Sequence, residues 1–189
     1  MREPAGSLQA AGLLATWLVA LAAAPVTGAR GPDPGVVDGC ASQRLPPDIL
    51  GGPAARTRTP LRLVDASAPQ AALRLAVAAD AAAREQGLMC VLQLRPQHGM
   101  IFVFPRDNDW EFWMKNTLVP LDMVWLRADG TVTTVAADVP ASTRATADAA
   151  VARRRGRGTY VVELRAGEAA ADGLAVATRL ALPSLRAIR

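Results

Sequence analysis

The stretch from residue 99 to residue 126 constrains the fold more than any other part of the chain. Its sequence, GMIFVFPRDNDWEFWMKNTLVPLDMVWL, holds six of the eight aromatic residues and the only lysine. An apolar run at 100–104 ends at Pro105, and the polar triplet at 107–109 predicts a turn. From 110 to 115 side chains alternate with the period of a β-strand. The alternation places Trp110, Phe112 and Met114 on one face and Glu111, Trp113 and Lys115 on the other.

The other predicted elements are also short. Alternation predicts a strand at 73–79, and further strands are predicted at 121–126, 131–136, 159–164 and 178–182. Asp129-Gly130 is a strong hairpin signal and joins the segment at 121–126 to the one at 131–136. A helix is predicted at 81–86, with Asp80 as its N-cap and Gly87 at its end, and Gly173 closes a second short helix at 167–172.

Five or more short strands with only two short helices favour a mostly β fold. The sequence therefore predicts a single compact antiparallel β-sandwich or barrel of jelly-roll-like character. This domain covers residues 71–185. Residues 30–70 are rich in proline and glycine, including Pro46-Pro47 and Gly51-Gly52-Pro53, and are predicted to form an extended leader segment to the domain.

The N-terminal segment reads as a targeting signal. Arg2 precedes an uncharged apolar run at 10–24, and small residues follow up to Ala29, which predicts a cleaved signal peptide over residues 1–29. The alternative is an uncleaved membrane anchor, although the run is short for a bilayer core of about 30 Å. Export predicts a periplasmic or extracellular protein. Residues 1–29 carry one basic and one acidic residue, so the mature chain keeps the net charge of +4, which does not indicate a nucleic-acid partner.

The chain has two cysteines, Cys40 and Cys90, and both follow the predicted cleavage site. An oxidising compartment permits a disulfide between them. A competing interpretation makes Cys40 a lipidated N-terminus, but Asp38 fits that motif poorly. Two cysteines and the single histidine, His98, are too few for a closed zinc site, so we expect no metal and no cofactor.

Several motifs together resemble one known family. They are Gly87-Leu88-Met89, GMIFVF at 99–104, FWMKNT followed by PLDM at 112–123, and YVVEL at 160–164 followed by Ala166-Gly167. The chain is similar to the prokaryotic domain-of-unknown-function 192 family over about residues 73–182. The resemblance implies a compact, mostly β domain that is often exported, and it implies no particular reaction. This chain has Val91 where many members have an arginine.

The central motif also supplies the candidate functional residues. Lys115 and Asp122 bracket the turn at 116–120 and would come close to facing one another if the flanking strands pair. One interpretation is an ion pair that locks the turn, worth only about 0–1 kcal/mol at a surface. The other is a ligand site at the edge of a concave sheet, made by Trp113, Lys115, Asn116 and Asp122.

Three functions are compatible with these residues. The first is a non-catalytic exported protein that binds a small molecule, a glycan or an envelope protein through the Trp113, Lys115, Asn116 and Asp122 region. The second is a carbohydrate-active hydrolase or lyase in which Asp122 and Glu163 act as an acid–base pair, which needs both carboxyls in one cleft about 5–9.5 Å apart. The third is a purely structural accessory protein. No G-x-S-x-G motif or phosphate-binding glycine loop is present.

A run of arginines at 153–157, RRRGR, is the strongest positive patch. It predicts a solvated mobile loop. The alternative is a contact with anionic envelope lipid or polysaccharide, which salt would weaken.

The disulfide is directly testable. We expect the oxidised protein to run differently on reducing and non-reducing gels, because a bond between Cys40 and Cys90 closes a loop of roughly 50 residues. Equal mobility, together with two free thiols on mass labelling, would exclude the bond.

Overall fold

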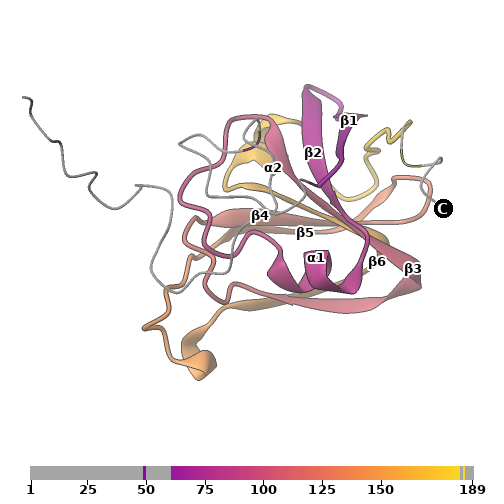
Figure 1. The fold of residues 1–189 in the computed structure, drawn as a ribbon. Coiled ribbons are helices and arrows are strands. Elements are labelled where there is room, and N and C mark those ends of the chain that lie inside the picture. Colours follow the sequence, from indigo (N-terminus) through magenta and orange to yellow (C-terminus); the bar gives the residue numbers. More distant parts are fainter. Residues whose placement is uncertain (1–48, 50–60, 184, 186–189) are drawn as a thin grey trace, which may run out of the picture. The chain divides into compact units, whose positions relative to one another are not determined.

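Six β-strands of the computed structural model form one sheet in the order β1-β2-β3-β6-β4-β5 (Figure 1). The structure describes residue 49, residues 61–183 and residue 185. Within these residues the strands are β1 (Leu63–Ser67), β2 (Ala72–Ala78), β3 (His98–Trp113), β4 (Leu121–Leu126), β5 (Val132–Val139) and β6 (Arg153–Arg165). The helices are α1 (Ala81–Gln86), the 3-10 turn η1 (Asp148–Ala150) and α2 (Glu168–Ala171). The predicted mostly β fold with short helices is confirmed.

The sheet is mixed and open, which corrects the predicted antiparallel sandwich or barrel. Four strand pairs are antiparallel, but β2 and β3 run parallel. A parallel pair needs a long crossover, and α1 with the loop that follows it supplies one here. The segment predicted as a last strand at 178–182 forms only two isolated bridges, Thr131 with Arg179 and Ser67 with Ala181.

Both faces of the sheet are covered. One hydrophobic cluster contains Met100, Phe102, Met123 and Trp125, and the other contains their alternating neighbours, such as Val124. Every residue of β4 is buried as a consequence. Two covered faces explain why β4 and residues 160–164 of β6 are apolar except for one acid each, Asp122 and Glu163.

The predicted turn at 107–109 is wrong, because β3 continues through it for 16 residues. The pairing of β3 with β6 shifts register between Val103 and Asn108, so residues 104–107 lie opposite Thr159 alone. Proline has no N–H to donate, and it is tolerated in strands at such bulges. Pro105 therefore produces a bulge within one strand and does not end it.

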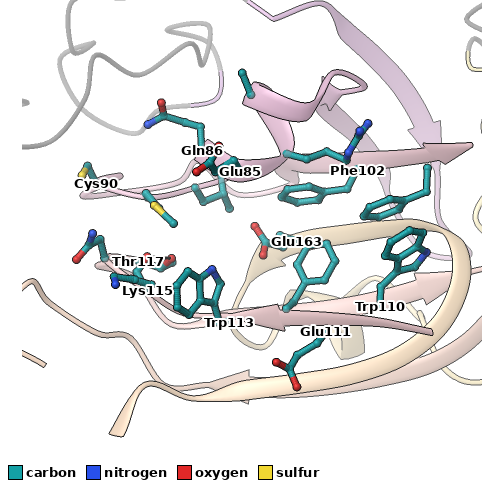
Figure 2. A pocket seen from close by; sticks show the side chains of 18 residues that line it. Glu85, Gln86, Cys90, Phe102, Trp110, Glu111, Trp113, Lys115, Thr117 and Glu163 are labelled. Carbon is teal, nitrogen blue, oxygen red and sulfur yellow. Dashed lines mark hydrogen bonds between the residues drawn. The ribbon is translucent and has the colours of Figure 1, made fainter. Parts of the chain in front are cut away.

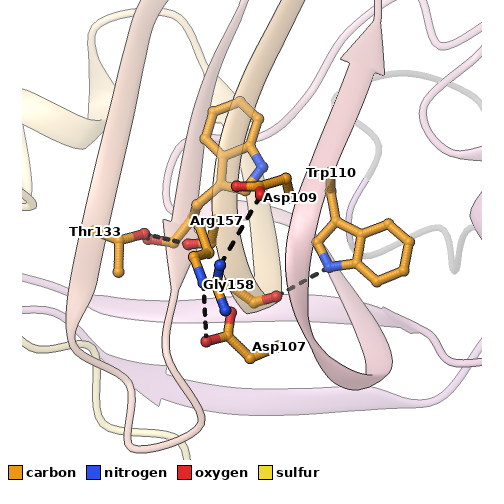
Figure 3. A network of polar contacts seen from close by, with 7 residues as sticks. Asp107, Asp109, Trp110, Thr133, Arg157 and Gly158 are labelled. Atoms are coloured by element: carbon orange, nitrogen blue, oxygen red, sulfur yellow. Dashed lines mark hydrogen bonds and ion pairs between the residues drawn. The ribbon is translucent and has the colours of Figure 1, made fainter.

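The predicted solvated loop at 153–157 is also wrong, because these arginines begin β6 and pair with the second half of β3. Arg155 and Arg153 contact the Glu111 carboxylate at 2.6 and 3.1 Å. Arg157 contacts Asp107 at 3.4 Å and Asp109 at 3.9 Å (Figure 3). Acidic residues on β3 thus offset the positive charge that the sequence concentrates here.

Several local predictions are confirmed. Asp80 caps α1 by accepting the Ala83 N–H at 2.7 Å, and Gly87 ends the helix. The hairpin between β4 and β5 turns at Asp129 and Gly130, where Gly130 has a φ of 88°. By contrast, β1 lies within residues 30–70, for which the sequence predicts an extended leader segment, and it is part of the sheet.

The predicted signal peptide (residues 1–29) and Cys40 lie outside the described residues, so cleavage and the disulfide stay predictions. Among the described residues, no helix has the length and apolar character needed to cross a membrane.

Gly156 tests the packing of β6 on β4. A Cβ added there would lie 2.5 Å from the Trp125 ring, which is fully buried. We expect Gly156→Ala to destabilise the fold by about 1–3 kcal/mol through overpacking, measured by urea unfolding. Arg155→Ala, at an exposed neighbouring position, is the control and should change stability little. An unchanged unfolding midpoint for Gly156→Ala would contradict this packing.

Candidate functional site

A pocket of about 830 Å³ lies between the α1 segment and the strands β3 and β6. The α1 side contributes Ala82, Arg84, Gly87 and Leu88. The sheet side contributes aromatic residues of β3 and one acidic residue of β6, Glu163. The volume is in the range of pockets that bind small molecules. Figure 2 shows the Glu163 carboxyl inside the pocket, with Phe102 on one side and Trp113 on the other.

Four aromatic rings of β3 form one wall of the pocket. Phe102 meets Phe112 edge to face at 4.8 Å between centroids, and Phe104 stacks on Trp110 at 3.8 Å. The bulge in β3 separates Phe104 from Phe112 in the register, yet their rings still meet edge to face at 6.2 Å. Trp110 is held in place because its indole N–H donates to the Gly158 carbonyl at 2.9 Å. The wall is therefore a rigid aromatic surface that a ligand can contact.

Glu163 is buried in the pocket floor without a partner. The residue is 5% exposed, and no described group donates a hydrogen bond to its carboxyl or forms an ion pair with it. Burial raises its pKa from 4.5 to about 8, because the charged form loses its hydration. Glu163 is therefore mostly protonated at neutral pH and available to an incoming group.

The close approach of β3 to β6 at this point requires Gly99. A Cβ on Gly99 would lie 2.1 Å from the Glu163 carbonyl oxygen. Any larger residue would push the Glu163 backbone away from β3. The glycine of the GMIFVF segment thus helps to position the buried acid.

Arg84 fixes α1 over the pocket. Its guanidinium donates to the Val103 carbonyl of β3 at 3.0 Å and to the Ala79 carbonyl before the helix. It also lies over the Phe104 ring, 5.4 Å from the centroid. The arginine therefore acts as a clamp between the helix and the aromatic wall.

Trp113 and Lys115 form the rim. The Trp113 ring is 37% exposed and is flanked by Lys115 at 5.0 Å and Arg153 at 4.8 Å from its centroid. The ion-pair partner of Lys115 is Asp148 of η1, at 3.2 Å. The predicted approach of Lys115 to Asp122 is therefore wrong.

Asn116 holds the turn that follows β3. Its φ of 52° is in the left-handed region, which asparagine tolerates better than most residues. Its carbonyl accepts the Cys90 N–H at 2.8 Å, which joins the turn to the loop after α1. Asn116 also lines the pocket, so its backbone conformation helps to shape the rim.

Asp122 lies elsewhere. It is fully buried on the other face of the sheet, on the same side as Val124. One oxygen accepts the Asp138 N–H of β5 at 2.8 Å, and the other accepts the Ala169 N–H of α2 at 2.9 Å. Asp122 thus joins β5 and α2 to β4, and it does not line the pocket.

The structure does not bring Asp122 and Glu163 together. In the ladder between β4 and β6, Met123 is opposite Glu163 and Asp122 is opposite Leu164. Successive side chains on a strand point to opposite faces, so the two carboxyls do not share a cleft. The geometry does not supply the acid–base pair of the hydrolase hypothesis.

Sequence reasoning missed the α1 wall of the pocket and the role of Glu163 in it. The motif Gly87-Leu88-Met89 was a signal, because all three residues line the pocket. Burial of Glu163 could be suspected from its neighbours Val161, Val162 and Leu164, which form a continuous apolar run around one acid. Among the described residues, no three His, Cys, Asp or Glu side chains are grouped to hold a metal ion.

The family model described as an uncharacterized ACR, DUF192, matches residues 63–182, which include all six strands of the described sheet. The chain belongs to the DUF192 family. The match begins at β1, so this strand is part of the DUF192 domain.

Two solved structures share the fold. One is a protein from Sinorhizobium meliloti described as a proposed transcription regulator, with 33% identity and a TM-score of 0.56 over 65% of this chain and 95% of that one. The other, from Novosphingobium aromaticivorans, has unknown function, 24% identity and a TM-score of 0.54 over 72% of this chain and 96% of that one. No curated protein matches the chain. Membership of the DUF192 family therefore establishes the fold of this chain, and it establishes no activity.

Asp122 should act on stability alone. In Asp122→Asn one side-chain oxygen becomes an NH2 group facing a backbone N–H, and a buried donor loses its acceptor. We expect a loss of about 1–3 kcal/mol in the free energy of unfolding, measured by urea denaturation. Asp148→Asn, at an exposed position, is the matched control. Equal stability of the two variants would contradict a structural role for Asp122.

Glu163 should make stability depend on pH. Between pH 4.5 and about 8 the unfolded state has lost a proton that the folded state keeps, so stability falls as the pH rises. The slope approaches about 1.4 kcal/mol per pH unit from this group. Glu163→Gln should flatten the profile and exceed wild type in stability near pH 8, in urea unfolding at a series of pH values. Glu85→Gln is the control and should keep the wild-type slope. Parallel curves for wild type and Glu163→Gln would contradict the assignment.

Proposed function

We propose that this protein binds a small molecule in the Glu163 pocket without transforming it. The observation that carries the proposal is a buried carboxyl with no partner, on the floor of an open pocket that has an aromatic wall. Burying an unpaired polar group costs stability. A ligand that supplies the missing partner offsets this cost.

The rim residues fit the same function. Trp113, Lys115 and Asn116 line the pocket, so three of the four predicted ligand residues remain candidates. Asp122 is replaced by Glu163 as the acidic member. The proposal is non-catalytic because Glu163 has no second acid, base or nucleophile bonded to it among the described residues.

We also propose that the protein works outside the cytoplasm, in the periplasm or beyond. The support is the apolar run at 10–24 with the small residues up to Ala29. N-terminal sequencing of the protein from an extracellular or periplasmic fraction should begin after Ala29, and a retained Met1 would contradict export by cleavage.

Ligand binding can be tested by filling the pocket. Ala82 is exposed on α1 and lines the pocket, whereas Ala81 is exposed beside it and does not. We screen a mixed set of fragments that includes indole, benzoate, glucose and choline. At least one of these fragments should raise the melting temperature of wild type and of Ala81→Trp. The same fragments should not shift Ala82→Trp.

Two results would contradict the proposed function. In the first, no fragment shifts the wild type. In the second, the fragments shift Ala82→Trp as much as Ala81→Trp, which places their binding outside the pocket.

A further inference from the structure

Glu163 lies among several charged side chains, and no described one of them pairs with its carboxyl. The other ionisable residues that line the pocket are Arg84 and Glu85 of α1, Glu111 of β3 and Lys115 of the turn. Arg84 donates to the Ala79 and Val103 carbonyls, and Lys115 pairs with Asp148. No described cation is therefore bonded to Glu163, although two lie in the same pocket wall.

The other acidic residues of the pocket do not compete with Glu163 for a positively charged ligand group. Glu111 is paired with Arg153 and Arg155, which also lower its pKa, and it extends away from Glu163 (Figure 2). Glu85 lies on the exposed side of α1. Glu163 is thus the one buried acid among the described pocket residues.

The aromatic wall beside Glu163 has the chemistry that attracts cations. Ring faces carry partial negative charge, and organic ammonium groups are recognised by such faces. The chain already uses two rings of this site in that way, with Lys115 at 5.0 Å from the Trp113 centroid and Arg84 at 5.4 Å from that of Phe104. Phe102, which lies beside Glu163 in Figure 2, and Phe112, whose ring meets Phe102 edge to face, have no described cation over them.

We infer that the pocket takes an organic ammonium ion, with its charged group between the Glu163 carboxylate and the Phe102 and Phe112 rings. The inference rests on the proposed function and names the ligand class. The apolar part of the ligand lies along the Phe104 and Trp110 rings toward the Arg84 clamp. A neutral ligand that accepts a hydrogen bond from protonated Glu163 is the competing class, and it has the opposite pH dependence.

The two classes differ in the proton that binding moves. A cation binds the ionised carboxylate, so Glu163 releases its proton as the complex forms. The pKa of Glu163 in the ligand-free protein is about 8. Well below this pH, only a small fraction of the protein therefore carries the ionised carboxylate that binds the cation. The apparent affinity should rise roughly 100-fold between about pH 6 and about pH 9. A neutral acceptor should instead bind more weakly as the pH rises.

The experiment compares cations with neutral isosteres of the same shape. Isothermal titration of the full chain uses choline against 3,3-dimethylbutan-1-ol, and benzyltrimethylammonium against neopentylbenzene. We expect each cation to bind at least about tenfold more tightly than its isostere at about pH 9, and to lose affinity as the pH falls. Glu163→Gln should lose both the preference for cations and the pH dependence, whereas Asp65→Asn, at an exposed position of β1 outside the pocket, should keep both.

Three results would overturn the inference. They are isosteres that bind as tightly as the cations, cation binding that Glu163→Gln leaves unchanged, and no binding of either cation at millimolar concentration. Isosteres that bind in the pocket, fail to bind Ala82→Trp and weaken as the pH rises would leave the proposed small-molecule function standing and replace the ligand class. Failure of the whole fragment set would instead contradict the proposed function itself.

Discussion

The antiparallel pairing of β3 with β6 is the constraint on which the rest of the structure depends. It runs from Gly99 opposite Leu164 to Trp113 opposite Arg153, and it joins the two longest strands of the sheet. The register decides which face each side chain occupies, and a slip by one residue would exchange the faces. Pairing in this register puts the aromatic residues of β3 beside Glu163 and puts acidic residues of β3 beside the arginines of β6. The pocket and the ion pairs between β3 and β6 are two results of one alignment.

Two buried acids on neighbouring strands show how differently the same chemistry is used. Asp122 of β4 has a backbone N–H on each oxygen and is part of the framework that holds β5 and α2. Glu163 of β6 faces the other way and has no such donor. A saturated carboxylate stabilises a fold, whereas an unpaired buried carboxyl costs stability, and such groups cluster at functional sites. The contrast makes Glu163 the acid that we assign to binding.

Much of the local structure follows from the sequence. The alternation at 110–113, the caps Asp80 and Gly87, and the Asp129-Gly130 hairpin depend on neighbours in the chain, and the structure confirms them. β3 ends at Trp113, before the last two residues of the predicted alternation. The errors involve distant partners. The arginine run at 153–157 looks like a loop until Glu111, Asp107 and Asp109 are placed beside it. Pro105 looks like the end of a strand until the pairing with β6 places it in a bulge of β3. The hydrogen-bond partners of Asp122 and the lack of a partner for Glu163 depend on which elements cover each face, and local patterns do not contain that information.

We propose that Glu163 is a buried acid that stays without a partner until a ligand binds. The most direct test is a pH titration of its side-chain carboxyl carbon by ¹³C NMR, assigned by comparison with Glu163→Gln. In the ligand-free protein we predict a midpoint at about 8. A midpoint near the ordinary glutamate value of 4.5 would show that the carboxyl is hydrated or already paired, and would contradict the account.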